Sequence, residues 1–170
     1  MSKRNLQRKN FINIIIGCFV IPLVLFVPMY FIGFEEYNFT GLLTEQKYAF
    51  VFHFLSVILL VWLHQMMIFH LPQKKKEIRI SSLLILFALF FPYAKDNQII
   101  STIHIMSAYA AFIFFNILFF QVLLMHRNYM QVYLCILAFV FMHSFVHGAV
   151  TGVSEVAWAS GVSIIISLIR

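Results

Sequence analysis

The sequence predicts an all-α, polytopic integral membrane protein, folded as a bundle of six transmembrane helices with both termini in the cytoplasm. The chain has 170 residues, of which 62% are hydrophobic and only 11% are charged, and its mean hydropathy is +0.93. Charged residues make up about a quarter of an ordinary soluble domain, so this chain needs the bilayer as its solvent. Its apolar residues also fall into six runs, and one crossing requires about 20 apolar residues.

The six apolar runs are the predicted spans, at residues 11–34, 48–71, 80–94, 99–125, 129–150 and 153–169. Pro22 and Pro28 are expected to kink the first helix, because proline cannot donate the backbone hydrogen bond of a helix interior. The third run is short, so its helix must tilt little or thin the bilayer locally. In the last run, the spacing of Ala157 and Gly161 predicts close packing against another helix. No loop is long enough for a further domain, so residues 1–170 are expected to form one transmembrane domain.

The distribution of charge predicts the direction of every helix. Ten of the twelve Lys and Arg residues fall on one side of the six-span arrangement: Lys3, Arg4, Arg8, Lys9, Lys74, Lys75, Lys76, Arg79, Arg127 and Arg170. Five of the six acidic residues fall in the alternate gaps: Glu35, Glu36, Glu45, Asp96 and Glu155. Positively charged segments stay in the cytoplasm, so both termini are predicted to lie on the cytoplasmic side of the plasma membrane. Tyrosines near the predicted interfaces indicate an aromatic belt: Tyr30, Tyr37, Tyr48, Tyr93, Tyr129 and Tyr133.

Three other classes are excluded or disfavoured by composition and position. The formal charge of +6 does not indicate a nucleic-acid partner, because the basic residues stand at helix ends and form no basic face. Anionic membrane lipids are the expected partner of these residues. Cys18 and Cys135 lie within apolar runs and are predicted to be buried free thiols rather than a disulfide. The first run is too long for a signal-peptide core, which favours an uncleaved span.

Four histidines are predicted to lie at similar depth near the outer face. His53 and His104 are each six residues inside the outer ends of their spans, and His143 and His147 lie about eight and four residues before the end of theirs. At 1.5 Å per residue, all four would stand roughly 6–12 Å below the outer surface. His143 and His147 are i, i+4 neighbours, the spacing by which a helix offers two ligands to one ion. Glu155, at the start of the last span, is expected within reach of the same layer.

The other histidines are expected to have different roles. His70 and His126 close two spans at the cytoplasmic side, where they are predicted to contact lipid headgroups. His64 lies about two turns from the inner edge and shares a helix face with His53 and Ser56, so its role is ambiguous. Ionisable groups within a span are costly unless they are paired, which makes each of them a functional hypothesis.

Several interpretations of the outer histidines stay open from the residues alone. A zinc site would use three of His53, His104, His143 and His147, with Glu155 as base or ligand. A metal-free acid–base site would use the same imidazoles, with His104 and Glu155 as catalytic residues. A haem could be held by two histidines on facing helices. In the purely structural interpretation, each imidazole hydrogen-bonds a backbone carbonyl or a serine across a helix interface.

Part of the chain resembles a known family. Phe91-Pro92, a short polar loop, His104, Ala108 and Phe112, together with Glu155 and Trp158, resemble the six-span FRAG/DRAM-type membrane family and its uncharacterised bacterial relatives. That family includes autophagy modulators and proteins of GPI-lipid remodelling, so the resemblance implies a lipid-linked role. The His143–His147 pair also resembles the HxxxH element of zinc-binding membrane hydrolases. Those hydrolases have seven spans and further Ser and Asp motifs, which this sequence lacks, and this puts the carry-over of their zinc chemistry in doubt.

The preferred expectation is a small membrane protein with a histidine-lined, outward-facing intramembrane site. Its activity would be metal-assisted or acid–base chemistry on a lipid or lipophilic substrate. Whether the protein is an enzyme stays open, because non-catalytic alternatives remain. A non-catalytic accessory or immunity-type membrane protein is the first alternative, and a haem-binding electron carrier is the second. Membrane lipids, a second copy of the chain or a partner membrane subunit are the expected partners.

Overall fold

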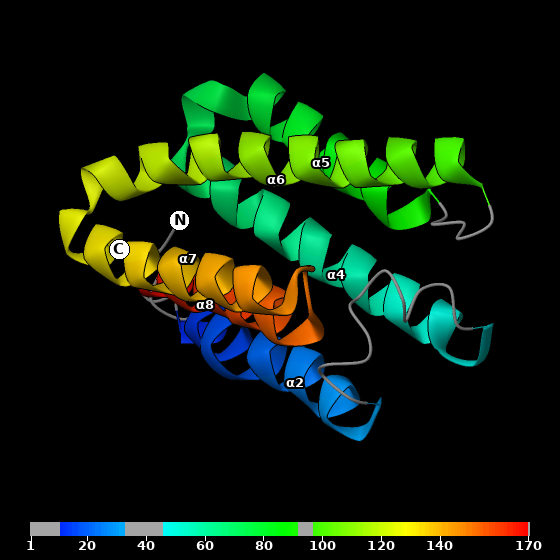
Figure 1. The fold of residues 1–170 in the computed structure, drawn as a ribbon. Coiled ribbons are helices and arrows are strands. Elements are labelled where there is room, and N and C mark those ends of the chain that lie inside the picture. Colours follow the sequence, from blue (N-terminus) through cyan, green and yellow to red (C-terminus); the bar gives the residue numbers. More distant parts are fainter. Residues whose placement is uncertain (1–10, 33–45, 92–96, 170) are drawn as a thin grey trace. The chain divides into compact units, whose positions relative to one another are not determined.

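In the computed structural model, the described residues are 11–32, 46–91 and 97–169, and every regular element within them is a helix (Figure 1). The first helix starts with residues 11–15, passes through a π-helical turn, η1 (Ile16–Val20), and continues as α2 (Ile21–Ile32). The remaining elements are α4 (Gln46–His70), the 3-10 turn η2 (Pro72–Lys74), α5 (Lys75–Phe90), α6 (Gln98–Met125), α7 (Arg127–His147) and α8 (Gly152–Leu168). The predicted all-α class is therefore confirmed for the described residues.

Three of these helices are long and apolar enough to cross a membrane. They are the part of α4 from His53 to His70, the whole of α6 and the whole of α7. Only 22%, 39% and 17% of these segments, respectively, are buried within the protein, so most of their apolar surface needs lipid or another apolar partner. Phe11–Val27 and Gly152–Leu168 are shorter apolar helices. These findings favour a membrane protein.

Two helix boundaries differ from the sequence prediction for local reasons. The helix expected from residue 80 begins at Lys75, because η2 starts at Pro72 and leads directly into α5. Glu77 lies in the first turn of α5, where its negative charge suits the helix dipole. Hydrogen bonds from its own backbone N–H and then from Lys74 hold the pKa of its carboxyl below the ordinary value. The helix expected to reach residue 150 ends at His147, since Gly148 takes a positive φ of 66°.

Some of the predicted features lie outside the described residues. They include the basic residues Lys3, Arg4, Arg8, Lys9 and Arg170, the acidic residues Glu35, Glu36, Glu45 and Asp96, and the tyrosines Tyr37 and Tyr93. The side chains of Pro28 and Tyr48 are not described either. The orientation of the termini therefore stays a prediction. A π-helical turn, η1, ends two residues before Pro22, and the kink expected at this proline stays a prediction.

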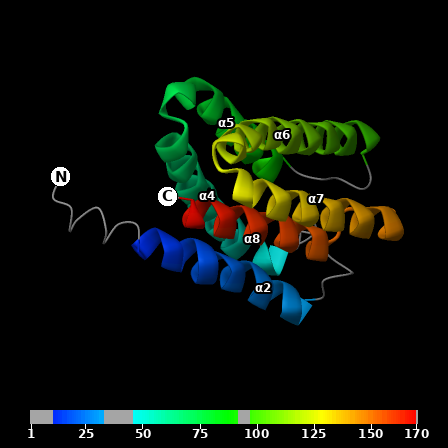
Figure 2. The same ribbon diagram turned by 90° about the vertical axis from the view of Figure 1, so that its left-hand side faces the viewer.

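The chain forms two compact units, and the expectation of one transmembrane domain stays a prediction. Unit 1 comprises residues 1–38 and 128–170, and unit 2 comprises residues 39–127. Within unit 1, the first helix runs alongside α8, as both ribbon views show (Figure 2). Gly17 is buried at this contact, and Ser163 Oγ shares its hydrogen between Gly17 O at 3.0 Å and Ser160 O at 2.8 Å. The backbones can approach so closely because Gly17 has no side chain.

The contact of α7 with α8 also belongs to unit 1 and corrects one prediction. Tyr133 was expected at a membrane interface, but it is 0% exposed, and Trp158 Nε1 donates a hydrogen bond to its hydroxyl at 3.0 Å. The packing expected at Gly161 is confirmed, because Gly161 is buried beside the Ile136 side chain of α7. Cys135 is a free thiol that lies exposed on α7, so the expectation that it is buried was wrong.

Unit 2 is built from α4, α5 and α6. The most extensive contact is between α5 and α6, and α4 covers α5 as well. The buried core contains Met67 of α4, Leu71 directly after α4, Ile78 of α5, and Phe119 and Val122 of α6. Asn97 caps α6, since its side chain accepts hydrogen bonds from the backbone N–H groups of the two residues at 99 and 100. Unit 2 therefore forms a three-helix layer with its own apolar core.

Candidate histidine site

The histidines predicted to form one site divide between the two units. His53 and His104 belong to unit 2, and His143, His147 and Glu155 belong to unit 1. The predicted meeting of all four imidazoles at one level stays a prediction.

In unit 1, the structure brings His143 and His147 into direct contact. Their ring centroids are 4.4 Å apart and the ring planes are inclined by 27°, which is a stacked arrangement. Both rings come from α7, one helical turn apart, so the predicted shared face is confirmed. Phe139, a further turn back, contacts His143 with 5.7 Å between ring centroids. His143 is half-buried and His147 is exposed, so the pair connects the packed part of α7 to its surface.

Thr151 holds the His143 ring in place, and sequence reasoning missed it. Thr151 Oγ1 lies 3.2 Å from His143 Nδ1. The same oxygen accepts a hydrogen bond from the backbone N–H of Ser154, and Ser154 Oγ accepts one from the backbone N–H of Thr151. This reciprocal cap fixes Thr151 at the start of α8. The Thr-x-x-Ser pattern before an apolar run could have indicated the cap, although not its bond to histidine.

Glu155 lies in the first turn of α8 and is half-buried. Its backbone N–H donates to Thr151 O at 3.1 Å, so Glu155 follows the histidine-bound threonine by one helical turn. Residues four apart share a helix face, which places this carboxyl on the Thr151 side of α8. A carboxylate is also favoured there by the positive end of the helix dipole.

In unit 2, His53 and His104 both contact the end of α5. The His53 ring lies 4.8 Å from the Phe90 ring, measured between centroids. His104 is 6% exposed, and its Nδ1 donates to Phe91 O, the C-cap residue of α5, at 2.8 Å. For His104, this bond matches the purely structural interpretation, in which an imidazole hydrogen-bonds a backbone carbonyl across a helix interface.

The remaining histidines have polar or aromatic partners in unit 2. His64 Nδ1 lies 2.7 Å from Ser82 Oγ of α5, so the ambiguous histidine of α4 forms an interhelical hydrogen bond. His70 and His126 close α4 and α6, and their ring centroids are 6.4 Å apart in an edge-on contact. Contact of these two rings with lipid headgroups stays a prediction.

Metal binding finds no support within the described ranges. Among residues 11–32, 46–91 and 97–169, no group of three or more His, Cys, Asp and Glu residues is arranged to hold a metal ion. A zinc site joining His53 or His104 to the His143–His147 pair would need both units and stays a prediction.

The fold and the histidine contacts define a class, an α-helical protein with three helices able to cross a membrane and with interacting imidazoles in both units. Comparisons with protein-family models, with curated proteins and with solved structures find no match for the chain. The resemblance to the FRAG/DRAM-type family therefore stays a prediction.

Proposed function

We propose that this chain is a six-span protein of the plasma membrane with both termini in the cytoplasm, and that it carries out acid–base chemistry on a lipid or lipophilic substrate. The histidines of α7 would face the outer leaflet in this arrangement. The charge asymmetry of the sequence and the apolar surface of α4, α6 and α7 support the placement.

The observation that carries the chemical part is the stacked His143–His147 pair and its bond to Thr151. With Nδ1 of His143 engaged by the threonine, Nε2 is the nitrogen that can reach a substrate hydroxyl or a water. His147, stacked on His143, is the second imidazole of this proposed acid–base pair.

His104 and Glu155 are the further catalytic candidates. Glu155 follows the cap of α8 that holds Thr151 against His143, and it belongs to the same unit as the His143–His147 pair. His104 Nδ1 is bound to a backbone carbonyl, so Nε2 is the ring nitrogen that would act as a base. Its participation requires the two units to bring it to the pair.

Labelling the full-length protein with 15N-histidine in lipid nanodiscs tests the proposal. Because the two rings are stacked, His147→Gln is expected to shift the NMR signal of His143. His126→Gln is the matched control, because it removes a histidine of unit 2 and should leave the His143 signal unchanged. An unchanged His143 signal in His147→Gln would contradict the contact between the two rings.

A second measurement addresses the substrate and the alternatives. Nanodiscs containing a total lipid extract are incubated with the protein, and lipid products are quantified by mass spectrometry. A product formed by the wild type and by His126→Gln, but reduced at least tenfold by His143→Gln, supports lipid chemistry. Unchanged lipids with every variant would overturn it in favour of an accessory protein. Stoichiometric zinc by elemental analysis, or a haem absorption band, would replace the metal-free mechanism by one of the metal-dependent alternatives.

A further inference from the structure

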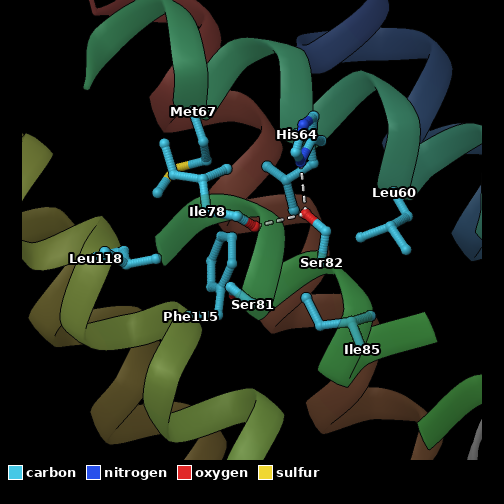
Figure 3. A pocket seen from close by; sticks show the side chains of 10 residues that line it. Leu60, His64, Met67, Ile78, Ser81, Ser82, Ile85, Phe115 and Leu118 are labelled. Carbon is cyan, nitrogen blue, oxygen red and sulfur yellow. Dashed lines mark hydrogen bonds between the residues drawn. The ribbon is translucent and has the colours of Figure 1, made fainter. Parts of the chain in front are cut away.

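A small cavity lies inside unit 2, between α4, α5 and α6 (Figure 3). Its volume is about 10 Å³, close to the smallest space that holds one water molecule. Most of its lining is apolar, including Met67 of α4 and Phe115 of α6. Three polar side chains also line it, His64, Ser81 and Ser82. The cavity is separate from the histidine pair of unit 1 and from the function proposed for it.

The hydrogen bonds around this cavity determine which atoms donate. Ser82 Oγ donates its single hydrogen to Ile78 O at 2.9 Å, one turn earlier in α5. The 2.7 Å contact with His64 must then be a bond from His64 Nδ1–H to Ser82 Oγ. A serine oxygen has two lone pairs, so Ser82 Oγ can still accept one further hydrogen bond.

Ser81 provides the independent observation. Its side chain is 2% exposed, and its hydroxyl has no hydrogen-bond partner among the described residues. A buried hydroxyl without a partner is destabilising and is rare in native proteins, where an ordered water commonly satisfies it. Ser81 and Ser82 line the same cavity from adjacent positions of α5, so one small molecule can contact both of them.

We propose that this cavity is a binding site for a single water molecule within the helix layer of unit 2. The water accepts a hydrogen bond from the Ser81 hydroxyl and donates one to Ser82 Oγ. These are two of the two to four partners that a buried water uses. The resulting chain runs from His64 of α4 through Ser82 and the water to Ser81, and it ties α4 to α5 by polar contacts.

The sign of a stability change distinguishes a hydrated cavity from a dry one. If water is bound, Ser81→Ala removes one of its anchors and should lower the thermal midpoint of the full-length protein in detergent by about 2–4 °C. If the cavity is dry, the same substitution removes an unsatisfied hydroxyl and should leave the midpoint unchanged or raise it. Ser160→Ala is the matched control, because Ser160 Oγ is also buried without a partner among the described residues but does not line this cavity. Its midpoint is expected to stay the same or rise.

A second variant and a direct observation keep the proposal testable if Ser81→Ala fails to fold. Ser82→Ala removes the other anchor and the bond to His64, so it should also lower the midpoint. A high-resolution density map should show one ordered water within hydrogen-bonding distance of Ser81 Oγ. An unchanged or higher midpoint for Ser81→Ala, or a map without that water, would overturn the assignment.

Discussion

Replacing Gly17 by alanine is expected to separate the first helix from α8. A Cβ at Gly17 would overlap Ser167 Oγ and would stand 2.6 Å from the backbone oxygen of Ser163. The serine side chain can rotate away, but the backbone oxygen can move only with its helix. Relieving the contact to an ordinary 3.4 Å requires a displacement of about 0.8 Å (3.4 minus 2.6) between the two helices.

The free energy of this displacement follows from overpacking and from the lost hydrogen bond. Overpacking a tight site typically costs about 1–3 kcal/mol. The bond from Ser163 Oγ to Gly17 O would lengthen as well, and an interhelical bond of this kind contributes about 0.6 kcal/mol in a membrane protein. The higher helix propensity of alanine returns up to about 1 kcal/mol. We therefore expect a net destabilisation of about 1–3 kcal/mol.

Gly161→Ala is the matched control for this experiment. The nearest atom to a Cβ there is Ile136 Cδ1 at 2.7 Å, the end of a side chain that can rotate. Thermal unfolding in detergent, followed by tryptophan fluorescence, should show a drop of about 2–4 °C per kcal/mol for Gly17→Ala and a smaller change for Gly161→Ala. Equal effects of the two alanine variants would refute the close helix contact.

Three further substitutions test individual contacts. Thr151→Val should destabilise the protein by about 1 kcal/mol, because it removes the cap of α8, and it should change the NMR signal of His143. Thr151→Ser should keep both the wild-type stability and the wild-type His143 signal. Tyr133→Phe removes the hydroxyl that accepts a hydrogen bond from the indole N–H of Trp158, and should lower the free energy of unfolding by about 0.6–1.7 kcal/mol; an unchanged midpoint in thermal unfolding would argue against that bond. Asn97→Ala should cost about 1 kcal/mol because it removes the cap of α6, and Asn97→Asp should recover most of it; equal midpoints for the two variants would contradict the cap.

Local patterns predicted the helices and one contact between site residues. The existence of each described helix follows from an apolar run, and the i, i+4 spacing of His143 and His147 correctly predicted that their rings meet. The partners of the imidazoles could not be predicted in the same way. Ser82 is 18 residues from His64, and Phe91 is 13 residues from His104. Such pairs depend on how neighbouring helices are rotated and shifted, which periodicity within one helix does not specify.

Tyr133 and Gly17 also show that contacts between helices could not be predicted from local sequence patterns. Tyr133 resembled an interfacial residue by its place near a helix start, but α8 covers it and Trp158 hydrogen-bonds to it. No sequence pattern around Gly17 indicated a close helix contact. Its importance comes from Ser163 and Ser167 of α8, and its hydrogen bond to Ser163 spans 146 residues of the chain.

The amino-acid sequence by itself determined that this is a helical chain suited to a membrane, and which residues carry titratable groups, because hydrophobicity and helical spacing are properties of adjacent residues. Only the tertiary structure decided which groups those imidazoles bond and where helices approach closely. Hydrogen bonds and close packing act over a few ångströms, so they depend on contacts between segments that are far apart in the chain.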